Sequence, residues 1–278
     1  MTAEKYAILG IFLFFAVMEA LRGGFFRKKE QRTKDGIVEL VSTVMLTGFT
    51  QPMILFASFA LVAWAFPEAR DALIGLPILL QIALLLIGDD LTQYWWHRLS
   101  HTTPWLYKLH RPHHDARYMS VRIVYRNNLF YYAMMPGLWI SGALIYLGLG
   151  WVYAGYIVIK MAVIIGAHST FRWDEKLYQI AWLSPVMWLV ERTISTPATH
   201  AAHHGRHASD PATHYKGNYG NLLFFWDVLF GTARITRKYP ELYGVENLPD
   251  VGVGEQLLWP LVRKSKKIAA EPIATPAE

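Results

Sequence analysis

Long apolar runs constrain this chain more than any other feature. Its 278 residues are 53% hydrophobic and 17% charged, and the apolar excess lies in four runs, at residues 6–21, 37–66, 73–88 and 129–167. A helix needs about 20 apolar residues to cross a bilayer. The runs therefore predict four to five transmembrane helices, with the last run folded as a hairpin that turns at Gly148-Leu149-Gly150. The large core of a soluble protein is the competing interpretation. We expect an all-α integral membrane protein.

Basic residues in the connecting loops predict the orientation. Six Lys or Arg residues follow the first run, between Arg22 and Lys34, whereas only Arg70 follows the second. Because Lys and Arg concentrate in cytoplasmic loops, the His-containing segments are expected in the cytoplasm. The predicted order is a transmembrane region with three spans at 1–96, a first cytoplasmic histidine segment at 97–128, a transmembrane hairpin at 129–168, a cytoplasmic cap at 169–262 and a disordered tail at 263–278.

Charge and cysteine content exclude several function classes. The net charge of +6 suits a protein that lies against anionic lipid, and no basic stripe on a soluble module supports nucleic-acid binding. Without cysteine there can be no disulfide, iron–sulfur cluster, haem thiolate or thiol nucleophile. The first run lacks a small-residue cleavage site, so it is expected to stay as an anchor.

Eight of the eleven histidines fall into three groups with helical spacing. An H-x-x-x-H pattern is followed by two H-x-x-H-H patterns, and the members are His97 and His101, then His110, His113 and His114, then His200, His203 and His204. Residues three and four apart share a helix face, so each group can aim its imidazoles at one point. Eight ligands exceed the three or four that one zinc ion takes, which predicts two metals. His168, at the end of the last apolar run, is a ninth candidate ligand.

Polar residues near these groups are candidates for holding the imidazole rings. Asp90 and Tyr94 precede the first group on the same predicted helix, and at about 100° per residue they lie on the face that carries His97. They are therefore placed to orient imidazole rings, although Asp90 could instead form a salt bridge. Glu191, which lies upstream of a helix start predicted at Thr196-Pro197, could also reach a ligand histidine.

The donor set favours redox chemistry over hydrolysis. Imidazole suits zinc, copper, iron and nickel, but zinc hydrolysis usually needs a general base such as Glu, and none lies within the three groups. Soluble di-iron proteins use carboxylates with Glu-x-x-His pairs, and imidazoles in place of most carboxylates still suit iron. Oxygen activation by two irons on a lipid substrate therefore fits best. A zinc-dependent membrane hydrolase comes second, and a non-catalytic metal or lipid binding protein third.

Several longer stretches carry a family resemblance. DDLTQYWWHRLSH, LYKLHRPHHDARYMS, GAHSTF, STPATHAAHHGRH and NYGNLLFFWDVLFGT together resemble the fatty acid hydroxylase / sterol desaturase superfamily of membrane di-iron oxygenases, over about residues 85–235. GAHSTF and TPATHAAHHGRH look most similar to the branch that contains alkylglycerol monooxygenase. The resemblance implies hydroxylation or desaturation of an unactivated C–H bond in a sterol, fatty acyl chain, sphingoid base, carotenoid or ether lipid.

The resemblance also assigns roles to individual residues. It implies that the eight grouped histidines and His168 bind two iron ions that use O2. It makes Asn218 and its neighbours a loop that frames the site, and it leaves Asp227 either a catalytic support or a helix cap. His207 and His214 are expected to be bystanders.

Partners and location follow from the same reasoning. The chain has no G-x-G-x-x-G motif and no cysteine, so its electrons must come from a separate ferredoxin, cytochrome or flavin reductase. We expect this donor to dock on the basic face near Arg111, Arg117 and Arg122. The protein is expected in a bacterial cytoplasmic membrane or the endoplasmic reticulum, with its metal site on the cytoplasmic side.

Overall fold

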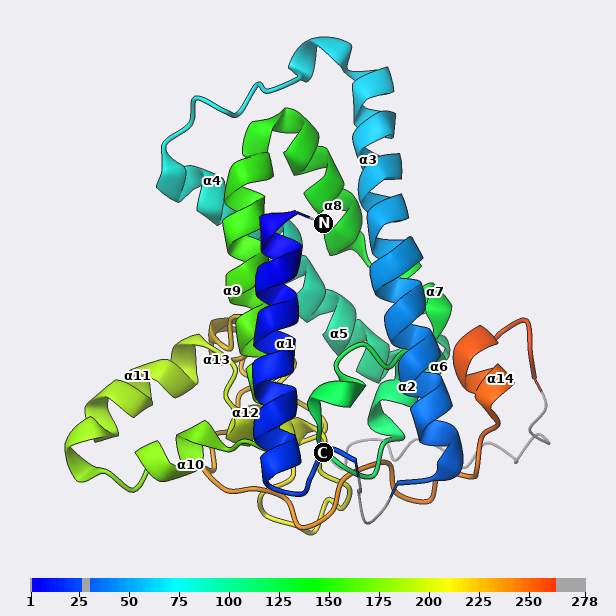
Figure 1. The fold of residues 1–278 in the computed structure, drawn as a ribbon. Helices are drawn as coiled ribbons and strands as arrows, with labels where there is room; N and C mark the ends of the chain where they lie inside the picture. The colour runs from blue at the N-terminus through cyan, green and yellow to red at the C-terminus, as the bar shows by residue number, and fades with distance from the viewer. Residues whose placement is uncertain (1, 27–30, 264–278) are drawn as a thin grey trace.

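The computed structural model describes residues 2–26 and 31–263 (Figure 1). Within these residues every regular element is a helix, and backbone pairing between extended segments is limited to two isolated bridges, Ile194 with Leu223 and Gly205 with Tyr243. The all-α prediction is therefore confirmed. Apart from Arg263, the tail predicted to be disordered lies outside the described residues.

In the part of the chain that the structure describes, two helical stretches are long and apolar enough to cross a membrane, Thr33–Ala65 and Pro136–His168. The first joins α2 (Thr33–Met45), the π-helical turn η1 (Leu46–Thr50) and α3 (Gln51–Ala65). The helix continues through Gln51-Pro52. Proline has no N–H to donate, and a wide turn just before it accommodates the lost hydrogen bond.

The second stretch is a hairpin. It joins α8 (Pro136–Leu144), η5 (Ile145–Leu149) and α9 (Gly150–His168), and Gly148 reverses the chain with φ of 108°. Figure 1 shows α8 and α9 meeting at this turn. A residue with a side chain rarely adopts such a φ, so the glycine in the predicted turn is what makes the hairpin possible.

The predicted third span begins later than expected. Residues 73–77 form turns, and the helix starts after Pro77 and runs through α4 (Ile78–Leu85), the π-helical turn η3 (Leu86–Leu91) and α5 (Thr92–Thr102). The first run forms α1 (Ala3–Leu21). Within the bundle of apolar helices, α1 packs against α9, and α3 packs against α8. At the second contact a Cβ on Gly142 would approach the Leu55 carbonyl oxygen to 2.7 Å, so a small residue lets the two backbones meet.

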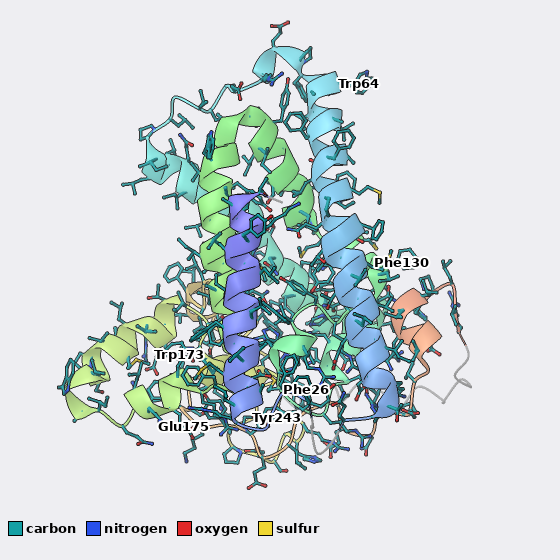
Figure 2. The ribbon with its side chains drawn as sticks, viewed as in Figure 1. Phe26, Trp64, Phe130, Trp173, Glu175 and Tyr243 are labelled. Carbon is teal, nitrogen blue, oxygen red and sulfur yellow. The ribbon has the colours of Figure 1, made fainter. Side chains whose placement is uncertain are left out.

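The histidine-bearing segments gather below this bundle (Figure 1). The elements there are α6 (Pro104–His114), η4 (Val121–Ile123), α7 (Leu129–Ala133), α10 (Trp173–Leu177), η6 (Ala181–Leu183), α11 (Ser184–Thr193), α12 (Pro197–His203), α13 (Phe225–Leu229) and α14 (Val253–Leu258). The short helix η2 (Pro67–Ala69) lies at the opposite end. Figure 2 shows Trp64 at that opposite end and Tyr243 in the lower part. Helix α11 leaves Val186, Trp188 and Leu189 exposed, which is typical of a helix that lies in a membrane interface.

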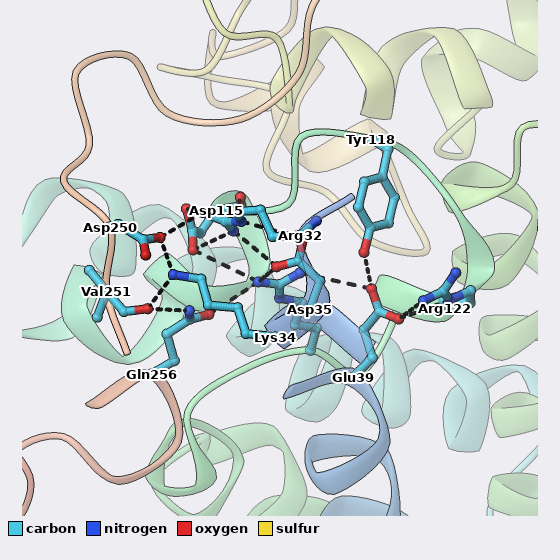
Figure 3. Close-up of polar contacts among 11 residues, drawn as sticks. Arg32, Lys34, Asp35, Glu39, Asp115, Tyr118, Arg122, Asp250, Val251 and Gln256 are labelled. Carbon is cyan, nitrogen blue, oxygen red and sulfur yellow. Dashed lines mark hydrogen bonds and ion pairs between the residues drawn. The ribbon is translucent and has the colours of Figure 1, made fainter. Parts of the chain in front are cut away.

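A buried network of charges ties α2 to the histidine segment (Figure 3). Its members are Arg32, Asp35, Glu39, Asp115, Tyr118, Arg122 and Arg126. The fully buried Arg126 donates to Asp35 over 2.9 Å, and Arg32 joins Asp35 to Asp115, which directly follows His114. Charges this deeply buried are tolerated only when paired, so the network holds α2 against the chain that carries the second histidine group.

This network changes the predicted docking face for an electron donor. Arg122 forms an ion pair with Glu39 at 2.6 Å, and Arg111 lies 3.5 Å from Glu255. Both arginines are largely buried, so carboxylates already neutralise two of the three cations that were expected to receive a partner. Docking of an electron donor near Arg111, Arg117 and Arg122 stays a prediction, and two of these three cations are already paired with carboxylates.

Replacing Arg126 by leucine is expected to cost about 3–5 kcal/mol of folding free energy, because it leaves buried carboxylates unpaired. The matched control is Arg70→Leu. Arg70 pairs with Asp71 at 3.7 Å, but both side chains are more than half exposed, so its loss should cost under about 1 kcal/mol. Thermal unfolding of the full chain in detergent measures both. Equal effects of the two substitutions would contradict the role given to the network.

Candidate metal centre

Nine histidines converge at the junction of the apolar bundle and the lower segments. One group comprises His97, His101, His110, His114 and His203, and the other comprises His113, His168, His200 and His204. Within each group one nitrogen from every ring lies within 4.8 Å of the others. The groups adjoin, since the rings of His114 and His204 stack with centroids 4.3 Å apart. All nine are the histidines that the sequence singled out.

The groups do not follow the sequence motifs. Two adjacent residues of α6 point into different groups, His113 into one and His114 into the other. At the end of α12, His203 joins the first group and His204 the second. Helix α5 contributes His97 and His101 to the first group. Helix α9 ends at His168, which belongs to the second group. Each H-x-x-H-H pattern therefore bridges the two groups.

The start of α12 is as predicted. The Thr196 side chain accepts a hydrogen bond from the Thr199 N–H, and Pro197 is the first helical residue. Proline suits this position because the first helical N–H has no partner in any helix. The cap fixes where the helix begins and so fixes the direction in which His200 and His203 point.

Five of the rings have a defined tautomer. Their Nδ1 atoms lie 2.7–3.1 Å from oxygen acceptors, and the pairs are His97 with the Tyr219 carbonyl, His203 with the Gly217 carbonyl, His168 with the Ile164 carbonyl, His113 with the Ile123 carbonyl and His110 with Asn127 Oδ1. These oxygens only accept hydrogen bonds, so Nδ1 carries the proton. In a neutral ring Nε2 then keeps its lone pair.

These lone pairs face one another. His97 Nε2 lies 3.0 Å from His203 Nε2, and His113 Nε2 lies 3.3 Å from His168 Nε2. Burial lowers the pKa of His97 to about 4 and that of His203 well below its ordinary value, so at neutral pH no proton bridges the first pair. Two lone pairs this close repel unless a cation lies with them.

Unpartnered nitrogens support the same conclusion. Nε2 of His101 and Nε2 of His204, one in each group, are buried without a hydrogen-bond partner among the described residues. A buried polar atom without a partner costs about 1–3 kcal/mol of folding free energy. One metal ion in each group would give both atoms a partner. The donor set of neutral imidazoles with protonated outer nitrogens therefore fits transition-metal ions.

A loop supports two of the rings from outside. Gly217 and Tyr219 supply the carbonyls for His203 and His97, and Asn218 between them adopts a left-handed φ of 57°. Its side chain donates to the Thr199 carbonyl and accepts from the Arg234 N–H. Asp227 accepts from the Tyr219 and Gly220 N–H groups at 2.8 and 2.6 Å. Asn218 and Asp227 thus shape the loop and do not contact an imidazole.

Asp90 and Tyr94 hydrogen-bond to the chain that follows this loop. Asp90 accepts from the Leu223 N–H and from Trp226 Nε1. The Tyr94 hydroxyl lies 2.9 Å from Thr232 Oγ1, which donates to Asp227. The expectation that Asp90 and Tyr94 help to orient imidazole rings stays a prediction; their hydrogen bonds go to the chain that follows Tyr219, whose carbonyl holds His97.

Three other candidates lie away from the two groups. Glu191 is buried, but it pairs with Arg237 at 2.8 Å and Arg192 at 3.0 Å and does not reach a histidine. His207 faces Glu246 at the surface. His214 is half-buried and its Nε2 lies 3.2 Å from the Thr232 carbonyl. The structure places both histidines outside the metal groups, whereas the suggestion for Glu191 is corrected, because two arginines bind its carboxylate.

Two features of the site were missed in the sequence. Asn127 holds His110, and its only signal was a run of polar residues before an apolar segment. The second is a cavity of about 750 Å³ in the bundle, which reaches His97, His110, His113 and His168. Its wall is mainly apolar, with residues from α1, η1 and α9. Such a cavity suits the chain or ring system of a lipid.

The comparisons with known proteins agree with this geometry. A family model for fatty acid hydroxylases matches residues 82–232, more than half of the chain. The chain belongs to this family. Its match begins just before Asp89 and contains all nine grouped histidines.

Three proteins that this chain is similar to are alkylglycerol monooxygenases, as the resemblance indicated. The protein from Danio rerio is 26% identical over 149 residues, covering 54% of this chain and 29% of that protein. The one from Xenopus tropicalis is 26% identical over 170 residues, covering 58% and 32%, and the human one is 27% identical over 154 residues, covering 52% and 29%. The aligned region thus spans under a third of each relative's length. No solved structure matches the chain.

Replacing His203 by alanine is expected to remove metal, because it takes a nitrogen from the first group and leaves His97 Nε2 without its partner. The bound metal per chain should fall by at least one equivalent. His207→Ala is the matched control, since that ring is at the surface, and it should keep the wild-type content. Elemental analysis of purified protein measures both. Full metal retention in His203→Ala would overturn the assignment.

Asn127 offers a separate test of how the rings are held. Asn127→Leu removes the acceptor of His110 Nδ1 and should weaken metal affinity roughly 10- to 100-fold. Asn127→Asp keeps an oxygen acceptor at the same place and should stay near wild type. Competition with a chelator gives both affinities. If the two variants behave alike, the hydrogen bond is not what positions His110.

Proposed function

We propose that this protein is a membrane-bound, O2-dependent di-iron enzyme that hydroxylates or desaturates an unactivated C–H bond of a lipid. One observation carries the proposal: two adjoining groups of neutral imidazoles, with bare Nε2 atoms facing inward, lie at the inner end of an apolar cavity. Family membership supports a lipid-modifying oxidoreductase.

The proposed ligands are the nine grouped histidines, with five for one iron and four for the other. When bound there, the two irons supply the activation of O2. Hydroxylation would consume one C–H bond, one O2, two electrons and two protons and give one alcohol and one water. Desaturation would consume the same O2, two electrons and two protons, remove two hydrogens from the chain and give one alkene and two waters. The names of the relatives favour the monooxygenase reaction and make an ether lipid the first substrate to test.

The protein's own residues have three tasks in this proposal. The carbonyls at Gly217 and Tyr219, together with Asn127, keep the outer nitrogens protonated and aim the inner ones at the metals. The apolar wall excludes water from the reacting carbon. The helical bundle places the substrate beside the imidazoles. The electrons would come from a separate ferredoxin, cytochrome or flavin reductase at the lower end, which we propose faces the cytoplasm of a bacterial membrane or of the endoplasmic reticulum.

Zinc hydrolysis is less well supported. Among the described residues, neither metal group contains a carboxylate, and Glu191, which was expected to reach a ligand histidine, is bound to arginines. Hydrolysis at zinc usually relies on a base that activates the metal-bound water.

Purification of the full chain under anaerobic conditions tests the function. We expect close to two irons per chain and O2 uptake that depends on both a reductant and an added lipid such as a 1-O-alkylglycerol. Mass spectrometry should find a product heavier by one oxygen, a cleavage product derived from it, or a product lighter by two hydrogens. His203→Ala is the inactive control. Zinc occupancy with turnover that needs no O2 would refute the proposal.

A further inference from the structure

A charged pair lies in the wall of the cavity, inside the apolar bundle. Lys160 Nζ contacts Asp89 Oδ2 at 2.5 Å, and the Tyr156 hydroxyl donates to the same oxygen at 2.8 Å. The side chains of both charged residues are about 5% exposed. Lys160 is the one charged residue of the Pro136–His168 stretch, so its charge interrupts an otherwise apolar helix.

Stability alone does not account for this pair. A buried ion pair contributes less than well-packed apolar residues of similar volume, because both charges lose their hydration. Ionisable residues within membrane segments mark sites of function, and they face a cavity or the bundle interior. Asp89 and Lys160 both line the cavity that reaches the histidines. The pair therefore gives the mainly apolar cavity a buried ion pair in its wall.

The Asp89–Lys160 pair lies at a defined distance from the metal groups along the helix axes. Asp89 precedes His97 by eight residues on one continuous helix, and Lys160 precedes His168 by eight residues on α9. At 1.5 Å per residue, both offsets equal about 12 Å along the helix axis. A ligand held by this pair would thus have its polar group at a set distance from the imidazoles.

Charge and hydrogen bonding define the ligand. Because Asp89 and Lys160 neutralise each other, the place offers no net charge to an anion, and Asp90 is buried one residue away. Lys160 has three N–H donors, and among the described residues only Asp89 is shown to accept one. No described residue donates a hydrogen bond to Asp89 Oδ1. A hydroxyl group can both accept from Lys160 and donate to Asp89, which a carboxylate cannot do.

The cavity opens where lipid would meet it. Its lining includes exposed residues near the start of α1, such as Lys5 and Leu9, and exposed residues around η1, such as Thr47 and Gly48. Because Thr33–Ala65 is apolar enough to cross a membrane, this opening faces the bilayer. Lys5 is the other Lys or Arg that lines the cavity, and it lies at the mouth.

We propose that Asp89 and Lys160, with Asp89 held by the Tyr156 hydroxyl, form the headgroup site for a neutral, hydroxyl-bearing lipid, and that this site sets which carbon reaches the metals. The inference rests on the proposed function for the second half of that statement. The first half, that this site binds a hydroxyl-bearing headgroup, can be tested by binding alone and does not require catalytic activity.

Binding by the full-length protein in detergent tests the headgroup site. The probes are radiolabelled 1-O-hexadecylglycerol, its 2,3-dimethyl ether and palmitate. Wild type should bind the free diol about tenfold or more tightly than the dimethyl ether, because hydrogen bonds to charged groups are lost on methylation. The double variant Asp89→Leu/Lys160→Met keeps the net charge and should bring that ratio close to one. Unchanged metal content and thermal stability show that it is folded.

A milder variant covers the case in which the double variant does not fold. Tyr156→Phe removes one hydrogen bond from Asp89 and should change the ratio by a smaller factor in a protein that keeps its metal. The proposal is overturned if neither variant changes the ratio. It is also overturned if palmitate binds more tightly than the diol and that preference disappears in Lys5→Met, which would place an anionic headgroup at the mouth.

Product analysis separates this inference from the proposed function. With hexadecyl and octadecyl substrates, anchoring predicts oxidation at a carbon counted from the hydroxyl end, whatever the chain length. Counting from the methyl end would overturn the anchoring while leaving the oxygenase function intact. A diol preference that depends on Lys160, in a protein with no O2 uptake, would support the headgroup site and refute the proposed function.

Discussion

The repulsion among inward-facing imidazole lone pairs is the constraint on which the rest of this structure depends. Nε2 atoms about 3 Å apart stay together without a cation only if the scaffold holds each ring from outside. Backbone carbonyls and Asn127 do this by accepting the Nδ1 protons, and burial keeps the rings neutral. Those acceptors belong to the last turn of α9, to η4 and to the loop that contains Gly217 and Tyr219, so the centre requires all of these segments at once.

The polar groups farther out hold these acceptors in place. Asp227 fixes the loop that carries the Tyr219 carbonyl, and Asp90 and Tyr94 bind the chain that follows this loop from the continuous helix of η3 and α5. On the other side Arg126 joins α2 to the segment that follows the second histidine group. Each carboxylate thus acts on a backbone segment, and through it on an imidazole. The centre keeps an all-histidine donor set although acidic residues surround it.

Much of this could be predicted, but not every role. The apolar runs indicated the helices, and histidine spacing indicated the ligands, because both depend on the period of a single helix. Asp90 was on the predicted face, yet its partner Trp226 is 136 residues away. Lys160 was visible as a lone charge in an apolar run, whereas its pairing with Asp89 and their place beside a cavity depend on how two helices pack.

The sequence by itself determined the helical class, the turn at Gly148 and the identity of the nine histidines. Local spacing and backbone freedom decide these features. Only the tertiary structure decided that His113 and His114 serve different groups and that Asn127 holds His110. It also decided that Glu191 forms ion pairs with Arg192 and Arg237 and does not reach a histidine. Neighbouring side chains on one helix diverge by about 100°, so their destinations depend on which helices lie on either side.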